Sequence, residues 1–334
     1  MRGTLVLIVC SCALLWPLAA RPETDVIRIP RGAGGVGFLP LLVMEQMRLV
    51  EKQARALGAD NLRADWIKLG GPAVVNDLLL SEAADVVVAG PPAFLTLWDR
   101  TRETIKVRGV AAMSSIPMYL NTRAAHLNSI KDLRPTDKIA VTAVKVSIPA
   151  IIMQMAAVKA FGAANYAHYD PFTVSLTHAD ALIALSSGRA DITAHFASPP
   201  FHQRERKLAD MHTIMSSNEV MGGPSTFTLL YTTSRFHDAN PKAVAAFLPA
   251  LEEAIGSINA DKRAAAQTFI DMEAQSMALA EVLEVLEDPD IRYTTTPENV
   301  MKYVDFMAGV GSIKLRSPSW QDLFFAGIHH LPGG

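Results

Sequence analysis

Cysteine is almost absent from this chain. Its 334 residues contain two cysteines, Cys10 and Cys12, and both lie in the apolar run at the amino end. If this run is a cleaved leader, the mature chain has no thiol. That excludes disulfides, thiolate metal sites and cysteine nucleophiles from the mature protein.

Motifs of enzymes and metal sites are missing too. The nine histidines show no H-E-x-x-H or similar spacing of metal ligands, and no G-x-S-x-G nucleophile elbow occurs. A formal net charge of -2 gives no electrostatic reason to expect nucleic acid as a partner, and the short mixed run at 204–207 (RERK) is typical of an exposed helix end. We therefore expect a protein that is not an enzyme, with no catalytic residues, no metal and no cofactor.

The apolar run at the amino end covers residues 5–15 (LVLIVCSCALL). It follows Arg2 and leads to the small residues Ala19 and Ala20, which is the pattern of a secretory signal peptide. The run is shorter than the ~20 residues that a spanning helix needs, and no later run reaches that length. We expect residues 1–20 to be a signal peptide and the protein to be periplasmic. An uncleaved anchor and a lipid attachment at a cysteine stay open as alternatives.

A repeated segment is the most informative feature that the sequence does have. Residues 75–94 (VNDLLLSEAADVVVAGPPAF) and 179–201 (ADALIALSSGRADITAHFASPPF) each predict a helix, a turn, a buried strand and a loop stiffened by two prolines. Ala84-Asp85 corresponds to Ala190-Asp191, and Pro91-Pro92 corresponds to Pro199-Pro200. The double use of this unit predicts two α/β lobes. Ligands of such sheets collect where the carboxyl ends of the strands meet, so we expect a cleft between the lobes.

Proline and glycine mark the order of the remaining elements. Strands are expected at residues 25–30, 62–69, 86–89 and 106–113, with helices between them, and the sheets are expected to be parallel. A further strand at 138–144 leads to a helix that Ser147 can cap and Gly162 can end. We assign residues 24–120 plus 230–334 to lobe 1 and residues 121–229 to lobe 2. The chain then crosses twice, near residues 120 and 230, and these crossings form a hinge.

Residues 32–37 match the dinucleotide-binding pattern G-x-G-x-x-G, between a strand and a helix. Yet the next strand ends in Leu69-Gly70-Gly71, so no acidic residue stands at its tip to bind a ribose. An exported protein would also meet little of such a cofactor. We interpret these glycines as a close backbone approach to another ligand, or as a flexible turn.

Two helix entries are candidates for binding an anion, because free N–H groups and the positive end of the helix dipole lie there. They are Gly70-Gly71 before Pro72, and the segment 145–147. Capping of the helix alone is the competing interpretation of both. Lys145 is the preferred attractive charge and Arg31 the second choice, although either is equally well explained as a surface cation. Ser114 and Ser115 offer hydroxyls, and His195 follows an apolar strand, where a structural role is the alternative.

The order of these loops resembles a known family. Gly71-Pro72-Ala73, Ala84-Asp85 with Gly90-Pro91-Pro92, Ser147, and Ala194-His195-Phe196 with Pro199-Pro200 resemble the nitrate/taurine/alkanesulfonate class of periplasmic solute-binding proteins of ABC importers. The resemblance implies a type II periplasmic-binding-protein fold of class α/β, in which each lobe is a mostly parallel sheet flanked by helices. It also implies a monomer that closes over a small solute and delivers it unchanged to a membrane permease and its ATPase.

The same resemblance implies which residues touch the solute. These are Gly35, Val36, Gly37, Phe38, Gly70, Gly71, Gly90, Pro91, Ser114, Ser115, Lys145, Val146, Ser147, His195 and Phe196. The solute itself stays open among taurine and other sulfonates, nitrate, carboxylates and pyrimidines. Two other classes also stay open. One is an exported enzyme, such as the related enzymes that make the thiamine pyrimidine, although these need a cysteine-rich stretch. The other is a sensor that passes the solute to no importer.

Overall fold

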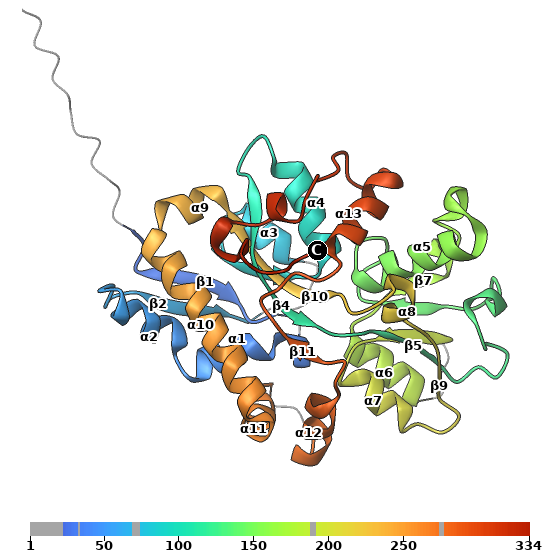
Figure 1. Cartoon of the computed structure of the whole chain (residues 1–334). Coiled ribbons are helices and arrows are strands. Elements are labelled where there is room, and N and C mark those ends of the chain that lie inside the picture. Colours follow the sequence, from blue (N-terminus) through green and yellow to red (C-terminus); the bar gives the residue numbers. More distant parts are fainter. Residues whose placement is uncertain (1–22, 33, 69–73, 188–191, 274–276) are drawn as a thin grey trace, which may run out of the picture.

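The computed structural model describes residues 23–32, 34–68, 74–187, 192–273 and 277–334. Several expectations therefore fall outside the described residues: the signal peptide at 1–20, Gly70 and Gly71, and the pair Ala190-Asp191. Figure 1 shows an α/β protein in which a four-stranded and a five-stranded sheet lie side by side, each accompanied by helices, and a two-stranded sheet extends the side of the first.

The first sheet has the strand order β11-β4-β10-β3, and β4 and β10 form its longest pair. Both β3 and β4 run antiparallel to β10, and β11 runs antiparallel to β4. A parallel pair, β1 and β2, continues this side of the molecule, because the backbone N–H groups of Asp85 and Val86 donate to the carbonyl oxygen of Arg28 on β1. The strands are β1 (Val26–Pro30), β2 (Arg63–Ile67), β3 (Val87–Ala89), β4 (Val107–Ser115), β10 (Thr226–Thr233) and β11 (Arg292–Tyr293).

The second sheet has the order β7-β6-β8-β5-β9. Its strand β6 pairs in parallel with both β7 and β8, whereas β5 runs antiparallel to β8 and β9. The strands are β5 (Tyr119–Thr122), β6 (Ile139–Val141), β7 (Thr173–Ser175), β8 (Ala194–Ala197) and β9 (His212–Ser216).

The chain passes between the two sheets twice. It leaves β4 at Ser115 and enters β5 at Tyr119, and it returns between β9 and β10 through the short helix α8 (Ser217–Met221). The two crossings are bonded to each other: the backbone N–H of Met118 donates to the hydroxyl of Ser217 (2.9 Å), and the N–H of Ser217 donates to the carbonyl of Met118 (2.8 Å). The α/β class is confirmed. Every pair of neighbouring strands in the first sheet is antiparallel, whereas the second sheet is mixed. Among the described strands, the expected parallel pairing holds for β1-β2, β6-β7 and β6-β8, because the strands next to the crossings run antiparallel to their neighbours.

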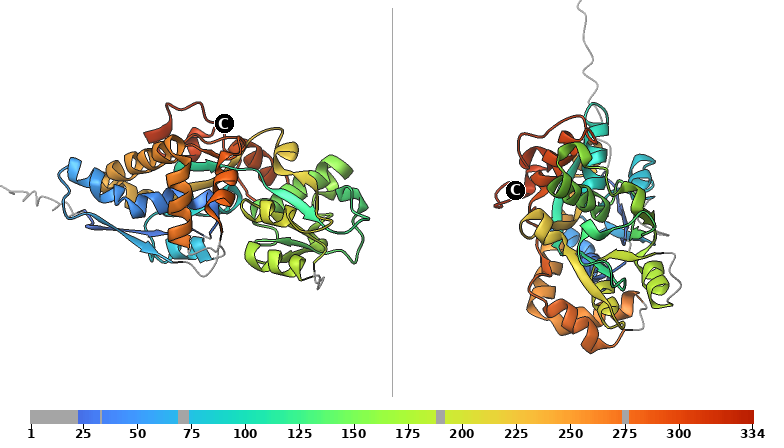
Figure 2. Two further views of the ribbon diagram at one scale, coloured as in Figure 1. Left: turned by 90° about the horizontal axis from the view of Figure 1, so that it is seen from below. Right: turned by 90° about the vertical axis from the view of Figure 1, so that its right-hand side faces the viewer.

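Helices accompany both sheets in Figures 1 and 2. With the second sheet lie α5 (Ile148–Phe161), α6 (His178–Ser186), α7 (Phe201–Arg206) and α8. With the first sheet lie α1 (Leu39–Gln46), α2 (Leu49–Ala56), α3 (Val75–Leu80), α4 (Pro91–Thr101), α9 (Ser234–Ala239), α10 (Pro241–Ala260), α11 (Lys262–Glu273), α12 (Leu279–Glu287) and α13 (Val300–Gly309). None of the helices formed by the described residues combines the length and the apolar character that crossing a membrane requires.

Local sequence signals explain where the helices begin and end. A proline stands in the first turn of α1, α4, α5 and α10, where its missing N–H costs no helical hydrogen bond. The predicted cap of α5 is confirmed, since the hydroxyl of Ser147 accepts from the N–H of Ala150. Gly162 ends the same helix with φ of 84°, a value that a residue with a side chain rarely adopts.

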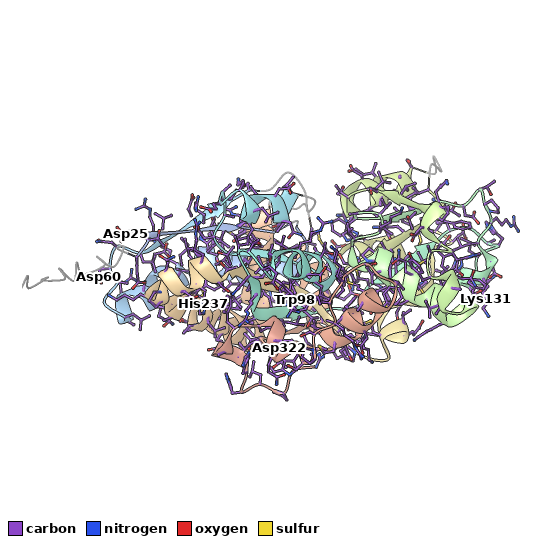
Figure 3. All side chains as sticks on the ribbon, turned by 90° about the horizontal axis from the view of Figure 1, so that it is seen from above. Asp25, Asp60, Trp98, Lys131, His237 and Asp322 are labelled. Carbon is purple, nitrogen blue, oxygen red and sulfur yellow. The ribbon has the colours of Figure 1, made fainter. Side chains whose placement is uncertain are left out.

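An aromatic cluster ties the carboxyl end of the chain to the first sheet. The ring of Phe94 packs against those of Tyr231 (5.3 Å between centroids) and Phe324 (5.7 Å). Gly109 on β4 leaves room for Phe324, because a Cβ at this position would stand 2.3 Å from its ring. In Figure 3 the molecule is elongated, with Asp25 and Asp60 near one end and Lys131 at the other.

The repeated segment folds as helix, strand and helix in both copies, as α3-β3-α4 and as α6-β8-α7. In the first copy, Asp85 has a structural role. Its buried carboxylate accepts from the backbone N–H of Arg28 (2.8 Å) and from the guanidinium Nε (2.9 Å) and Nη2 (2.6 Å) of the same residue. Asp85 therefore fixes β1 beside β3.

Asp85→Ala is expected to lower the free energy of unfolding by about 2 kcal/mol, because it leaves the Arg28 backbone N–H and guanidinium without their charged acceptor. Urea denaturation followed by circular dichroism measures the change. Asp65→Ala on the adjacent strand β2 is the matched control, since Asp65 is exposed and its replacement should change stability by less than about 0.5 kcal/mol. Equal effects of the two substitutions would contradict the anchoring role of Asp85.

Candidate functional site

The loop between β1 and α1 reaches the loop between β8 and α7. Gly35 has φ of 93°, and a Cβ placed on it would stand 3.4 Å from the carbonyl oxygen of Pro199 and 4.0 Å from the ring of Phe201. The backbone angle favours a residue without a side chain, and the spacing is that of an ordinary van der Waals contact. The glycine-rich segment thus does allow a close approach, and in this structure the approaching group is protein.

A second approach links the other predicted loops. A Cβ on Gly90 would stand 2.6 Å from Cδ1 of Ile148, the first residue of α5, and 3.4 Å from the carbonyl oxygen of Phe227. The ring of Phe227 also lies under Gly37, where a Cβ would stand 2.3 Å from it. Phe227 therefore contacts both the loop that contains Gly37 and the loop that contains Gly90.

We call this set of contacts the loop junction. It consists of residues 35–38, 90–91, 147–148, 199–201 and 227–228, which come from segments attached to both sheets. The sequence pointed to the first two segments and to Ser147. It missed Ile148 and Phe227 as contact residues, because an apolar side chain at a helix start or in a strand indicates core packing.

The predicted hydroxyls hold the first loop in place. Ser114 Oγ lies 3.1 Å from the carbonyl oxygen of Gly37 and 2.6 Å from Oγ1 of Thr228, which also reaches this carbonyl at 3.1 Å. Ser115 donates to the carbonyl oxygen of Ser225 (3.0 Å). All three hydroxyls are buried and bonded to protein atoms. Contact of Ser114 and Ser115 with a solute stays a prediction.

Tyr293 on β11 also holds the loop between β1 and α1. Its hydroxyl donates to the carbonyl oxygen of Val36 at 2.8 Å, and burial raises the pKa of this phenol far above its ordinary value. The donor is therefore protonated at every physiological pH. Neighbouring backbone carbonyls of the loop are thus held by donors from β4, β10 and β11.

The segment before α5 is the most open part of the candidate site. Lys145 is exposed with φ of 64°, and within the described residues it makes no ion pair or hydrogen bond. Val146 is 50% exposed. Ser147 accepts from Ala150 and donates to the carbonyl oxygen of Ala143 (2.6 Å), so its hydroxyl serves the helix entry.

Arg31, the second predicted cation, lies among carboxylates. It is paired with Glu45, whose pKa is raised by burial although the bond to Arg31 opposes the rise. Burial also raises the pKa of Glu273, and one oxygen of this carboxylate lies 3.3 Å from where a Cβ on Gly34 would stand. Arg31 is thus already neutralised by the protein.

His195 and Phe196 lie inside the second sheet with no exposed surface. The ring of His195 is bonded on one side to Glu205 and on the other to Nδ1 of His178 (2.8 Å). Glu205 has no exposed side-chain surface, so the expectation that residues 204–207 form an exposed helix end is wrong at this position. The histidine ten residues earlier gives this carboxylate a buried partner, a pairing that no local pattern indicates.

Two surface hollows lie elsewhere. One of about 450 Å³ lies between α6 and α7, beside Leu182, Arg204 and Leu208, and another of about 500 Å³ lies beside Lys262, Leu286 and Tyr293. Of the predicted site residues that the structure describes, none lines either hollow. Among the described residues, no three histidine, aspartate or glutamate side chains are grouped in a way that would hold a metal ion.

Comparison with solved structures identifies the fold. The alkanesulfonate-binding protein of Xanthomonas axonopodis pv. citri, bound to MOPS, matches with a TM-score of 0.68 and 15% identity over 88% of this chain and 96% of the other. The periplasmic aliphatic sulphonate-binding protein of Escherichia coli matches with a TM-score of 0.65 and 13% identity, over 91% and 92%. The periplasmic nitrate-binding protein of Synechocystis PCC 6803 matches with a TM-score of 0.60 and 13% identity, over 80% and 71%.

These likenesses show that the chain has the periplasmic-binding-protein fold, as the resemblance implied. At such low identity they define the fold and leave the solute open. No family model matches the chain, and the search of curated proteins gave no match.

Gly90→Ala is expected to destabilise the protein by about 1–3 kcal/mol, because the new methyl group overlaps Ile148 across the loop junction. In an Ile148→Ala background the same substitution should cost almost nothing, since the overlapping atoms are gone. A double-mutant cycle of urea midpoints measures this coupling. Gly256→Ala is the control, because a Cβ at that helix position meets no atom within 4 Å. Additive effects of Gly90→Ala and Ile148→Ala would show that the contact does not exist in solution.

Proposed function

We propose that this protein is the solute-binding component of an ABC importer, which binds a small anionic solute at the loop junction. The observation that carries the proposal is the meeting of loops from both sheets at one place, on a fold whose chain crosses twice between the sheets. Structural neighbours described as binding sulfonates and nitrate support an anion of the sulfonate, nitrate or carboxylate type.

Binding by hinge closure follows from this arrangement. The proposed lobes are residues 24–120 plus 230–334 and residues 121–229, with the hinge at the crossings. A solute that contacts loops of both lobes stabilises the closed state, because those contacts are lost when the lobes separate. The approach of Gly35 to Pro199 and of Gly90 to Ile148 is the kind of contact that a closed state makes.

The amino end of α5 supplies the chemistry for an anion. The positive end of the helix dipole lies at its first turn, and the exposed Lys145 adds a full charge beside it. Pro149 has no N–H and the N–H of Ala150 is already bonded to Ser147, so the dipole and Lys145 carry the attraction for an anion. The proposed solute contacts remain the fifteen residues implied by the family resemblance, including Gly70 and Gly71.

Location and partners follow from the same proposal. The protein works in the periplasm as a monomer after removal of residues 1–20, and it hands the solute to a membrane permease with an ATPase subunit. It does not alter the solute. Chemical turnover would instead indicate an exported enzyme that uses the same loops.

Methanesulfonate, taurine, nitrate and benzoate form a panel that tests the ligand class. At least one of them should raise the melting temperature, because a ligand that binds only the native state stabilises it. Incubation with the purified protein should return that compound unchanged. A panel without any shift would contradict the anionic class, and a modified compound would favour the enzyme.

Lys145→Ala is expected to weaken binding of the anion found in the panel by about 3- to 10-fold, with a smaller loss at high salt, since one exposed charge next to the anion contributes on the order of 1 kcal/mol. Titration calorimetry at low and high salt measures both quantities. Lys131→Ala is the matched control, because Lys131 is an exposed lysine at the far end of the molecule (Figure 3). Unchanged affinity in Lys145→Ala would remove this residue from the site.

A further inference from the structure

Three side chains form a hydrogen-bonded series inside the half that contains the second sheet. Glu205 on α7 is bonded through Oε1 to Nδ1 of His195 on β8, and Nε2 of His195 lies 2.8 Å from Nδ1 of His178 at the start of α6. Glu205 and His195 have no exposed surface. We call Glu205, His195 and His178 the histidine relay.

The relay ends beside the loop junction. The ring of His178 stacks on that of Phe201, with 5.3 Å between centroids and 28° between planes, and Phe201 is the residue that approaches Gly35. His178 is mostly buried but keeps some exposed surface, and none of the described residues hydrogen bonds to its Nε2. Because Nδ1 is occupied by His195, this free nitrogen lies on the other side of the ring.

The inner end of the relay is fixed by Asn121 on β5. The hydroxyl of Thr213 donates to Oδ1 of Asn121 (2.8 Å), which leaves Nδ2 to donate to Oε2 of Glu205 (2.7 Å) and to Nδ1 of His202 (3.1 Å). Burial, with a smaller effect of Arg206, lowers the pKa of His202 to about 4, so this ring is neutral and its Nδ1 accepts. Glu205 therefore has one oxygen committed as an acceptor.

Two protonation states satisfy both bonds inside the relay. In the neutral state, one proton lies between Glu205 and His195, a second lies between the two histidines, and a third is carried by Nε2 of His178. Loss of a proton makes the relay negatively charged and leaves Nε2 bare, because the inner bonds keep theirs. Burial favours the neutral state, since an uncompensated buried charge is costly.

We propose that Nε2–H of His178 donates a hydrogen bond to an anionic oxygen of the solute, and that His195 and Glu205 keep this nitrogen protonated. The inference rests on the proposed function and adds the residue that selects an anion. A neutral relay offers a donor to a sulfonate, carboxylate or nitrate oxygen. A deprotonated relay offers a lone pair and a negative charge, which repel the same group.

The pKa of His178 agrees with this assignment. Burial, and then the charge of His195, lower the pKa of His178 well below its ordinary value, so this ring is neutral and carries a single proton. Other ionisable side chains of the same helices are Asp180 on α6 and His202, Arg204 and Arg206 on α7. Across the junction, Glu273 lies near Gly34 and its charge interacts with that of Arg31. Asp180 accepts from Thr177, and Arg206 donates to the carbonyl of Met211.

Nuclear magnetic resonance of ¹⁵N-histidine in the solute-free protein tests the relay directly. In the wild type, Nε2 of His178 should carry a proton at pH 6 and lose it as the pH rises. In Glu205→Gln the amide donates to Nδ1 of His195, so no titrating proton remains and Nε2 of His178 should stay protonated to pH 9. If Nε2 of His178 titrates in the same way in Glu205→Gln and in the wild type, the relay is overturned.

Calorimetry with methanesulfonate, in buffers of different ionisation enthalpy, tests the contact with the solute. Wild-type affinity should fall about tenfold per pH unit above the point at which the relay loses its proton, with uptake of one proton on binding there. Glu205→Gln should bind with an affinity that does not depend on pH and without proton uptake. His178→Phe keeps the stack on Phe201 and should bind about 10- to 100-fold more weakly at pH 6.

His168→Phe is the matched control, because His168 is an exposed histidine that packs on aromatic rings in the half that contains the second sheet. The His168→Phe variant should bind methanesulfonate with wild-type affinity. The proposal is overturned if His178→Phe binds methanesulfonate as tightly as the wild type does. It is also overturned if the affinity of Glu205→Gln depends on pH in the same way as that of the wild type. In both cases the proposed binding of a solute would still stand. If the wild type binds none of methanesulfonate, taurine, nitrate and benzoate at pH 6, the anionic class of the proposed function fails, and the role of His178 fails with it. Melting curves of each variant confirm that it is folded.

Discussion

The carbonyl oxygen of Gly37 is the point on which the candidate site depends. Two buried hydroxyls reach it, Ser114 at the end of β4 and Thr228 near the start of β10. These are the strands next to the two crossings, so the same bonds that hold the first loop also fix it relative to the path between the sheets. Tyr293 holds the preceding carbonyl, which leaves the loop little freedom. A rigid loop loses little entropy when a partner binds, and that favours tight binding.

Much of the fold could be predicted because its signals are local. Proline in a first helical turn, serine before it and glycine at the end are read from a few neighbouring residues, and they placed α5 correctly. The alternation of strands and helices likewise located β1 and β3 within one or two residues. Direction within a sheet is a different matter. Whether β10 runs parallel or antiparallel to β4 depends on pairing between residues more than a hundred positions apart, and no short pattern encodes it.

The site was less accessible to sequence reasoning for the same reason. A glycine at position 35 or 90 indicates that another group lies close to the backbone. The sequence does not show whether that group is a solute or a protein residue, which in the structure is Pro199 for Gly35 and Ile148 for Gly90. Glu205 illustrates the opposite difficulty. A charged residue in a short run of charged residues is usually solvated, and only the fold brings His195 and Asn121 to its two oxygens. Polar groups that satisfy one another inside an apolar sheet are costly to misplace, so they fix the packing of α7 on the sheet.

The bonds between Met118 and Ser217 have a mechanical consequence. Two independent linkers between rigid domains permit rotation about many axes. Two linkers that are hydrogen-bonded side by side act together as one hinge, which permits bending but resists torsion. In the proposed mechanism this tie would favour bending of the two halves about the paired crossings over twisting of one half against the other.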